Sequence, residues 1–341
     1  MLISLIPLLT IALPTYNRAD LLDGALGRLL PQIDENKNDI EFVISDNAST
    51  DNTQEVVKKY IREYPGINFI SNLQPHNTGY FGNFKKCKEL SQGKYFWLLS
   101  DNEHVAYGVV SFLIKTINST NNQVGAYYFE NTIPVSKIKL DVDYETFTTI
   151  QTNFSNLVKN ETAWKLTSIS SVVFVNDKRY DSESLLKLNE NLFLGFIFLC
   201  NAMRINDKIS IINGNIYISV PCKVYFDIFK AWTIDIIECV NYMTNSGLLT
   251  EYQKLQFVSS FLKANVREHV YLYKLQGSIN GKSYGTIKEL KNQLDSFYND
   301  NPYYKAHITP LFLRKKWVLV ATHFIKRVRR KLDKVYSEKI E

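Results

Sequence analysis

An apolar run at residues 95–99 is followed, within four residues, by the acidic side chains of Asp101 and Glu103. A short, continuously apolar segment of this kind predicts a strand that is buried on both faces, as in a parallel sheet. In extended backbone, side chains two positions apart lie on the same side, so the two carboxylates can converge on one point. Such oxygen ligands suit Mg²⁺ or Mn²⁺. The alternative is a solvated acidic turn that follows a core strand.

Apolar runs and helical patterns alternate along the first third of the chain. Strands are predicted at residues 9–13, 41–44, 67–70 and 95–99, and helices at residues 20–30, 53–63 and 84–90. We expect Asn17 or Asp20 to cap the first of these helices. Strands that alternate with helices through short loops favour right-handed βαβ crossovers. The sequence therefore predicts an α/β fold with a mainly parallel sheet.

Each predicted strand ends in a polar segment, and these segments are residues 14–18, 46–51, 74–79 and 101–103. The carboxyl ends of parallel strands meet at one edge of the sheet, which is where sheets of this class bind ligands. The four segments together predict a single ligand site. Asp46 could instead be a turn or capping residue, although Asp51 could supply that cap. Asn77 precedes a Gly-containing turn and could be purely conformational.

The composition is that of a globular chain, with 341 residues, 45% hydrophobic and 22% charged. Its four cysteines show no metal-binding spacing, and we expect them to be reduced, as in a cytoplasmic protein. The apolar N-terminus lacks the positive charges of a signal peptide and is interpreted as the first strand. No stretch has the length of uncharged apolar residues that spans a bilayer.

From residue 221 the pattern becomes helical, with helices predicted at residues 225–242, 251–273 and 287–298. We therefore expect a first domain over residues 1–220 and a helical region over residues 221–341.

A last predicted helix carries an apolar stripe that includes Trp317, Phe324 and Ile325. Residues 301–332 contain nine Lys or Arg and no acid, so the rest of the chain contributes −3 to the net charge of +6. A basic amphipathic helix of this kind suits the anionic inner face of a plasma membrane. The alternative is the solvated face of a helix that docks on its own core. The aromatic residues are not interleaved for base stacking, so we expect no nucleic-acid partner.

The ordered set of polar segments resembles family 2 glycosyltransferases with the GT-A fold. The matching pieces are Pro-Thr-Tyr-Asn-Arg at residues 14–18, Asp-Asn-Ala-Ser-Thr-Asp at 46–51, Asn-Thr-Gly at 77–79 and Leu-Leu-Ser-Asp-Asn-Glu at 98–103. The chain is most similar to the bacterial branch that builds O-antigen and capsule repeat units, including abequosyltransferase-like proteins. The resemblance is strong over roughly the first 110 residues and thin beyond them.

This resemblance implies a nucleotide-sugar site. The residues that would contact the nucleotide sugar are Pro14, Thr15, Asn17, Asp46, Asn77 and Asp101. Among them, Asp46 would accept a hydrogen bond from the imide N–H of uracil or thymine, while Thr15 and the neighbouring backbone would hold the nucleoside. The expected donor is therefore a UDP or dTDP sugar.

The resemblance also implies a metal site. Asp101 and Glu103 would correspond to the family's DxD motif, which holds Mn²⁺ or Mg²⁺ on the diphosphate. This chain departs from the pattern, because Asn102 is in the middle and Glu103 replaces the last aspartate. The loop after Asn77 also lacks the arginine often found there. Lys85 or Lys86 could replace it, or both could be part of a solvated helix face.

A catalytic base is expected between residues 181 and 204, since inverting members take a carboxylate from this region. Glu190 is the first choice, with Asp181 and Glu183 behind it. The alternative for each is an acid at a helix start, which the helix dipole favours.

The sequence thus predicts a metal-dependent, inverting hexosyltransferase that moves a sugar to a lipid-linked oligosaccharide during lipopolysaccharide or capsule synthesis. We expect it to act from the cytoplasm as a peripheral membrane protein. A sugar nucleotidyltransferase is a rival, but it would need a Gly-rich, Arg-containing loop after the first strand. The non-enzymatic rival is a degenerate GT-A protein that binds nucleotide or glycan as an assembly partner.

Overall fold

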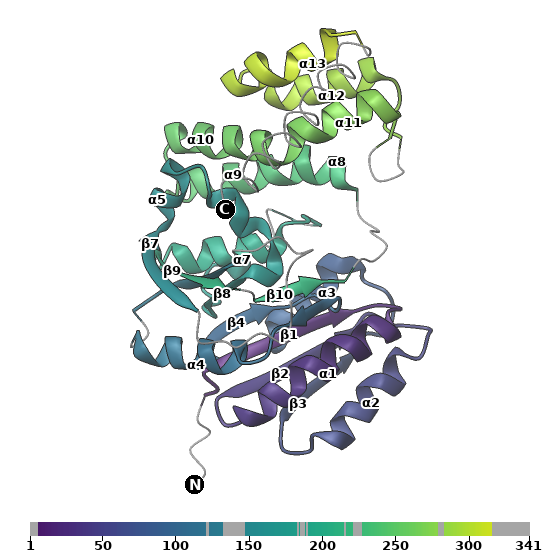
Figure 1. The fold of residues 1–341 in the computed structure, drawn as a ribbon, viewed down its shortest axis with the longest axis vertical. Helices are drawn as coiled ribbons and strands as arrows, with labels where there is room; N and C mark the ends of the chain where they lie inside the picture. The colour runs from purple at the N-terminus through teal and green to yellow at the C-terminus, as the bar shows by residue number, and fades with distance from the viewer. Residues whose placement is uncertain are drawn as a thin grey trace, which may run out of the picture.

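The structure is a computed structural model of the 341-residue chain. It describes residues 6–120, 123–131, 147–182, 184, 188, 190–214, 216–220, 227–278 and 283–315. A sheet of mixed direction forms the centre, and a group of helices lies on one side of it (Figure 1).

Eight strands of the described chain form the main sheet, in the order β3-β2-β1-β4-β8-β6-β9-β7. They are β1 (Leu9–Thr15), β2 (Ile40–Asp46), β3 (Asn68–Leu73), β4 (Tyr95–Leu98), β6 (Ala126–Asn131), β7 (Thr148–Asn153), β8 (Val172–Val175) and β9 (Lys208–Gly214). β1 to β4 are parallel to one another, and β6 is parallel to β9. β8 runs antiparallel to β4 and β6, and β7 runs antiparallel to β9. The predicted α/β fold with a mainly parallel sheet is therefore confirmed.

Helices cover both faces of this sheet. Alternate residues of a strand point to opposite sides, and the apolar side chains on each side are buried by helices. They are α1 (Ala19–Glu35), α2 (Thr53–Glu63), α3 (Gly79–Leu90), α4 (Val109–Ser119), α5 (Phe154–Lys159) and α7 (Leu194–Met203). On one face, Ile11 and Trp97 pack in a cluster with apolar residues of α1, α2 and α4. On the other face, Ala12 and Phe96 pack in a second cluster with residues of α3, α5 and α7.

The C-terminal helices share the second of these clusters, in which α7 residue Phe196 stacks on α10 residue Phe257. These helices are α8 (Ile228–Lys230), α9 (Ile236–Asn245), α10 (Glu251–Phe261), α11 (Arg267–Gln276), α12 (Ile287–Tyr298) and α13 (Thr309–Leu313). Capping boxes start α10 at Thr250 and α12 at Thr286. The boundary at residue 220 stays a prediction, and residues 221–226 lie outside the described chain.

One sequence expectation changes and another is not tested by the described residues. The first helix is preceded by Arg18, which makes no side-chain capping bond, so neither Asn17 nor Asp20 caps it. Instead, Asp51 accepts from the backbone N–H of Ala19 at 3.1 Å. The predicted basic amphipathic helix falls in residues 316–341, outside the described chain. Among the described helices, none combines the length and the apolar character needed to cross a bilayer.

Candidate functional site

Thr15 lies at the meeting point of three strands at the carboxyl edge of the sheet. It is the last residue of β1 and lies opposite Asp46, the last residue of β2. Its Oγ1 donates a hydrogen bond to Oδ2 of Asp101 at 2.9 Å. All three side chains are buried, at 3%, 1% and 2% exposure. The structure therefore brings together three of the residues predicted for the nucleotide-sugar site, and Pro14 lies one residue before them in β1.

Asp101 is also paired with a cation of the chain. Nη1 of Arg18 lies 2.7 Å from Oδ1 of Asp101, so each carboxylate oxygen of Asp101 accepts from a different side chain. Burial raises the pKa of Asp101, while the Arg18 charge and the hydrogen bonds from Arg18 and Thr15 act in the opposite direction. The guanidinium thus stabilises the ionised form of a buried acid.

Glu103 points to a different partner. It begins β5 (Glu103–Val105), which pairs with β10 (Tyr217–Ser219), and Oγ of Ser219 donates to its carboxylate at 2.9 Å. Burial raises the pKa of Glu103 to about 7, against the hydrogen bonds of Ser219 and Ser170. Asn102, between the two acids, donates to the carbonyl of Val220 at 2.8 Å and fixes the loop to the segment after β10.

The donor chemistry of this edge fits a divalent cation, because the carboxylates of Asp101 and Glu103 and the hydroxyl of Thr15 are hard oxygen ligands. These groups are bonded to protein partners, and in the described part of the chain no three His, Cys, Asp or Glu side chains are grouped to hold a metal. A cation on Asp101 would compete with the Arg18 guanidinium for the same carboxylate.

Asp46 is held by the turn that follows it. Its Oδ1 accepts from the backbone N–H of Ser49 at 2.9 Å, and its Oδ2 accepts from Nε2 of Gln54 at 2.6 Å. Asp51 meanwhile accepts from the backbone N–H of Thr53 at 3.1 Å, near the start of α2. The N-cap of α2 is Asn52 and makes no side-chain capping bond, so Asp46 does not cap this helix, and its contact with Ser49 is that of a turn residue.

The loops after β1, β2 and β3 are tied to one another by amide side chains. Asn17 Oδ1 accepts from the backbone N–H of Thr50 at 2.7 Å. Asn77 Oδ1 accepts from Nδ2 of Asn47 at 2.9 Å and from the backbone N–H of Gly79 at 2.8 Å. Asn17 and Asn77 thus shape the loops of the site through contacts within the protein.

Asn83 is a residue of this edge that the sequence did not predict. It is buried in α3, and its Nδ2 donates to the carbonyl of Ser45 at 2.9 Å and to that of Thr15 at 3.3 Å. It therefore clamps the ends of β1 and β2. Lys85 and Lys86, in the same helix, lie 3.7 and 3.0 Å from the carboxylate of Glu89. Those pairs match the solvated helix face that was the alternative for these lysines.

Glu190, the first choice for the catalytic base, lies against the start of α3. Its carbonyl accepts from the hydroxyl of Tyr80 at 2.9 Å and from Nζ of Lys230 at 3.2 Å. Tyr80 follows Gly79, whose carbonyl accepts from Asn47 at 3.0 Å, so Glu190 borders the loops of the carboxyl edge. The Glu190 side chain is exposed.

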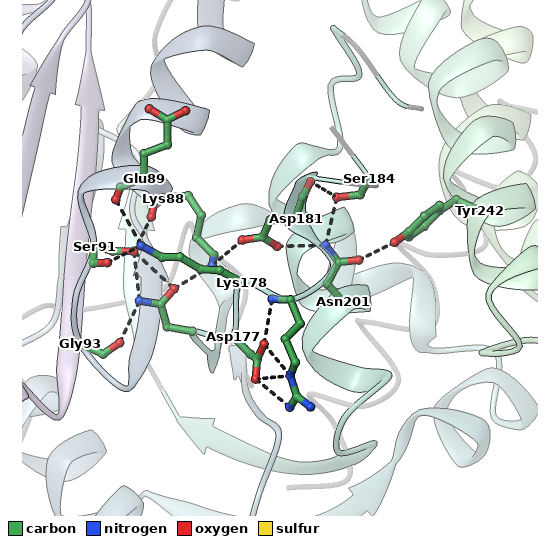
Figure 2. Close-up of polar contacts among 12 residues, drawn as sticks. Lys88, Glu89, Ser91, Gly93, Asp177, Lys178, Asp181, Ser184, Asn201 and Tyr242 are labelled. Carbon is green, nitrogen blue, oxygen red and sulfur yellow. Dashed lines mark hydrogen bonds and ion pairs between the residues drawn. The ribbon is translucent and has the colours of Figure 1, made fainter. Parts of the chain in front are cut away.

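Asp181, by contrast, lies at the opposite edge of the sheet. Its Oδ2 is 2.9 Å from Nζ of Lys88, near the C-terminal end of α3, and its Oδ1 accepts from Asn201 at 3.0 Å (Figure 2). Lys178, in the same network, donates to the carbonyl of Ser91 at 2.8 Å, just before β4 begins. The structure does not bring Asp181 to the other site residues, and Glu183 lies outside the described chain.

Most residues with a strained backbone conformation lie at the carboxyl edge of the sheet. In the described chain, four residues other than glycine have positive φ, namely Asn17 (50°), Ala48 (64°), Glu161 (58°) and Glu190 (60°). Left-handed conformation costs a residue with a side chain on the order of 1–3 kcal/mol, and it persists where the surroundings fix it. Glu161 is remote from the site residues, whereas the other three belong to loops of this edge. Such clustering is typical of a functional site.

The fold is shared with a solved structure that carries a nucleotide sugar. A crystal structure of S. aureus TarS 1-349 in complex with UDP-GlcNAc is similar with a TM-score of 0.58, over 86% of this chain and 81% of that one, at 14% identity. The sheet, its loops and this likeness define a protein with the GT-A fold and a helical C-terminal region. Residues 10–176 match the family model for glycosyl transferase family 2. This part of the chain belongs to that family.

Curated relatives are similar over about a third of the chain. Abequosyltransferase RfbV of Salmonella typhimurium is 32% identical over 112 residues, which are 33% of this chain and 33% of the relative. A Campylobacter jejuni GalNAc(5)-diNAcBac-PP-undecaprenol beta-1,3-glucosyltransferase is 29% identical over 112 residues, 33% of this chain and 35% of the relative. The matched stretch thus spans about a third of each of these two relatives.

Proposed function

We propose that this protein transfers a sugar from a nucleotide-diphosphate sugar, of the UDP or dTDP type, to a hydroxyl of a lipid-linked oligosaccharide. The transfer inverts the anomeric carbon and serves surface polysaccharide synthesis. The family of residues 10–176 supports sugar transfer, and the undecaprenol-linked acceptor named for the Campylobacter relative supports a lipid-linked one. A peripheral position on the inner face of the membrane follows from such an acceptor.

The observation that carries this proposal is the junction of Thr15, Asp46 and Asp101. In a mainly parallel sheet, the carboxyl ends of the strands form the ligand site, and these three buried polar residues meet there. A buried carboxylate such as Asp46 is the acceptor that an imide N–H of uracil or thymine requires, whereas cytosine lacks that donor.

The residues divide the reaction between them. Asp46 orients the base, and Thr15 and Asp101 hold the nucleoside near the diphosphate. Asp101 and Glu103 would hold Mg²⁺ or Mn²⁺, which supplies positive charge beside the departing diphosphate. Glu190 takes the proton of the acceptor hydroxyl, whose oxygen bonds to the anomeric carbon as the bond to the diphosphate breaks. Positioning of the two substrates contributes much of the remaining rate.

A binding panel tests the proposal with a matched pair of variants. Asp46→Asn keeps an oxygen for the Ser49 N–H but loses the carboxylate charge, while Asp34→Asn makes the same change at an exposed site paired with Lys37. We expect Asp46→Asn to weaken UDP binding about tenfold, since a lost charged acceptor costs roughly 1–3 kcal/mol. Asp34→Asn should bind as the unaltered chain does. Equal affinity of both variants for UDP and dTDP, by calorimetry, contradicts the base-binding role.

Turnover completes the test. Release of UDP or dTDP from a panel of nucleotide sugars, measured with undecaprenol-diphosphate-linked saccharides as acceptors, is the expected activity. If nucleotide binds tightly and no donor is turned over, the degenerate binding protein is the better description.

A further inference from the structure

The Glu190 backbone is held from two sides. The hydroxyl of Tyr80, in the first turn of α3, donates to its carbonyl at 2.9 Å. Nζ of Lys230, at the end of α8, donates to the same carbonyl at 3.2 Å. Tyr80 belongs to the start of α3, beside the loop that contains Asn47, and Lys230 belongs to the C-terminal helices. Both donors meet at a single carbonyl oxygen.

The two residues after Glu190 are fixed by the same helices. Asn191 is fully buried, and its Nδ2 donates to the carbonyl of Asp235 at 2.9 Å. The backbone N–H of Leu192 donates to Oδ2 of Asp235 at 3.2 Å, and Oδ1 of Asp235 lies 2.6 Å from Nζ of Lys230. Asp235 therefore anchors Lys230 and the loop together, so three consecutive residues have defined positions.

This backbone is fixed in a conformation that glutamate does not favour. Glu190 has a φ of 60°, and glutamate lacks the local hydrogen bonding that lets asparagine adopt the left-handed region. Among the described residues, its exposed carboxylate has no hydrogen bond or ion pair, so the fold gains nothing from that side chain. A strained main chain that presents an unpaired acid is the arrangement expected where the acid itself is used.

We propose that Tyr80 and Lys230 are positioning residues that hold Glu190 in its left-handed conformation, with its carboxylate turned toward the acceptor. The proposal rests on the proposed function, in which Glu190 takes the acceptor proton. Burial, with the charges of Asp235 and Glu190, raises the pKa of the Tyr80 hydroxyl, so this group remains a donor at neutral pH. Lys230 is paired with Asp235.

The alternative is that these contacts only join α3 to the C-terminal helices. The two cases differ in kinetics, because a positioning residue acts on the chemical step through Glu190 and leaves nucleotide binding unchanged. Losses from residues that act as one unit are also not additive, so removal of the carboxylate should abolish the effect of the other residues.

The variants are Tyr80→Phe, Lys230→Met, Lys230→Arg and Glu190→Gln, together with Tyr80→Phe in the Glu190→Gln background. Glu161→Gln is the matched control, because Glu161 is a second glutamate with positive φ (58°) and lies outside the site. Two measurements are made on the full chain. The first is hydrogen exchange of the backbone amides at residues 190–193, and the second is nucleotide release from the donor selected by the panel.

We expect Tyr80→Phe and Lys230→Met to speed exchange at residues 190–193 severalfold and to lower kcat about tenfold, with KM for the donor changed less than threefold. Lys230→Arg should recover most of kcat, because a guanidinium can still donate to the carbonyl and pair with Asp235. In the Glu190→Gln background, Tyr80→Phe should not lower kcat further. Glu161→Gln should have the kcat and the exchange rates of the unaltered chain.

Unchanged exchange at residues 190–193 in both Tyr80→Phe and Lys230→Met overturns the positioning role, whatever the activity of these variants. Faster exchange with unchanged kcat, in a chain where Glu190→Gln abolishes turnover, shows a structural contact and overturns the positioning role. Full turnover by Glu190→Gln, or no turnover by the unaltered chain, instead removes the base assigned under the proposed function, and the positioning role is lost with it.

Discussion

Lys88 and Asp181 form a buried ion pair, with Nζ and Oδ2 2.9 Å apart and side chains 4% and 11% exposed. Asn176 accepts from the same ammonium at 2.7 Å, and Asn201 donates to the other oxygen of Asp181 at 3.0 Å. Tyr242 then donates to Asn201 at 2.7 Å, which extends the chain of contacts from α3 through α7 to α9 (Figure 2). The pair therefore joins the sheet-bearing part to the C-terminal helices.

Removal of one partner of this pair should destabilise the fold. We expect Lys88→Met to lower the free energy of unfolding by about 3–5 kcal/mol, because it leaves the Asp181 charge buried and uncompensated. Lys88→Met combined with Asp181→Leu should recover much of this loss. Urea unfolding provides the measurement, and a loss below about 1 kcal/mol in the single variant contradicts the burial argument. If Asp181→Asn instead stops turnover without destabilising the fold, Asp181 is the catalytic base.

The path of the chain explains why the sequence could not separate Asp181 from Glu190. Both are acids before a helical segment, and both were candidates for the base. β8 runs antiparallel to β4, so its carboxyl end lies at the opposite edge from the ends of β1 and β2. Asp181 follows β8 by only six residues and stays at that edge. Strand direction depends on pairing between distant segments, which a local pattern does not contain.

What the sequence did contain was local. The helices at Thr53–Glu63 and Ile287–Tyr298 have the predicted bounds, because hydrophobic periodicity and capping residues specify them directly. The gathering of Asp46 and Asp101 followed from strand ends in a parallel sheet. The sequence did not predict roles for Asn83 and Tyr80, because their contacts with Ser45 and Glu190 join residues that are 38 and 110 positions apart in the chain.

Arg18 should compete with a divalent cation for Asp101. The guanidinium lies 2.7 Å from Oδ1, so a metal ion that binds Asp101 is repelled by its positive charge. We expect Arg18→Met to bind Mn²⁺ about tenfold more tightly than the unaltered chain in the absence of nucleotide, as measured by electron paramagnetic resonance. Arg62→Met, at an exposed position in the last turn of α2, is the control and should have no effect. Equal Mn²⁺ affinity in Arg18→Met and the unaltered chain refutes the competition.

Glu103 should make the metal-free protein less stable as the pH rises. Its folded pKa of about 7 exceeds the ordinary 4.5, so the folded state holds the proton more tightly than the unfolded state does. The resulting stability is present below pH 4.5 and is lost as the pH rises from there to about 7. Glu103→Gln cannot ionise, and we expect it to exceed the unaltered chain in stability above pH 7 by up to about 3 kcal/mol.

Thermal unfolding between pH 4.5 and 8 checks this expectation, with Glu161→Gln as the control at an exposed glutamate paired with Lys263. If the melting temperatures of Glu103→Gln and the unaltered chain differ by a constant amount across that pH range, the raised pKa of Glu103 is contradicted. Addition of Mn²⁺ at pH 8 should raise the melting temperature of the unaltered chain more than that of Glu103→Gln, since ligand binding to the folded state stabilises it.

A cut after Lys315 leaves the described contacts of α13 in place. Leu311 in α13 is buried, and Nζ of Lys274 donates to the carbonyls of Leu311 and Phe312 at 2.7 and 2.6 Å. A truncation near Thr309 would delete these contacts, whereas one after Lys315 keeps them. The shortened chain 1–315 should therefore melt close to the full chain and bind UDP with the same affinity.

Removal of that segment should abolish binding to anionic vesicles. Each Lys or Arg near an anionic surface contributes about 1 kcal/mol, and residues 316–341 contain the predicted stripe of Trp317, Phe324 and Ile325 with its basic flanks. We expect the full chain to sediment with phosphatidylglycerol vesicles but not with phosphatidylcholine ones. High salt should release most of it, because the screening length falls from about 10 Å at 0.1 M to about 3 Å at 1 M.

The full chain with Arg327, Arg329 and Arg330 changed to Gln separates charge from folding, and it should bind these vesicles weakly while melting normally. If the shortened chain still sediments with them, the membrane contact lies within residues 1–315. If it instead melts far below the full chain, the apolar stripe packs on the protein's own core, because only burial in the fold makes its removal destabilising.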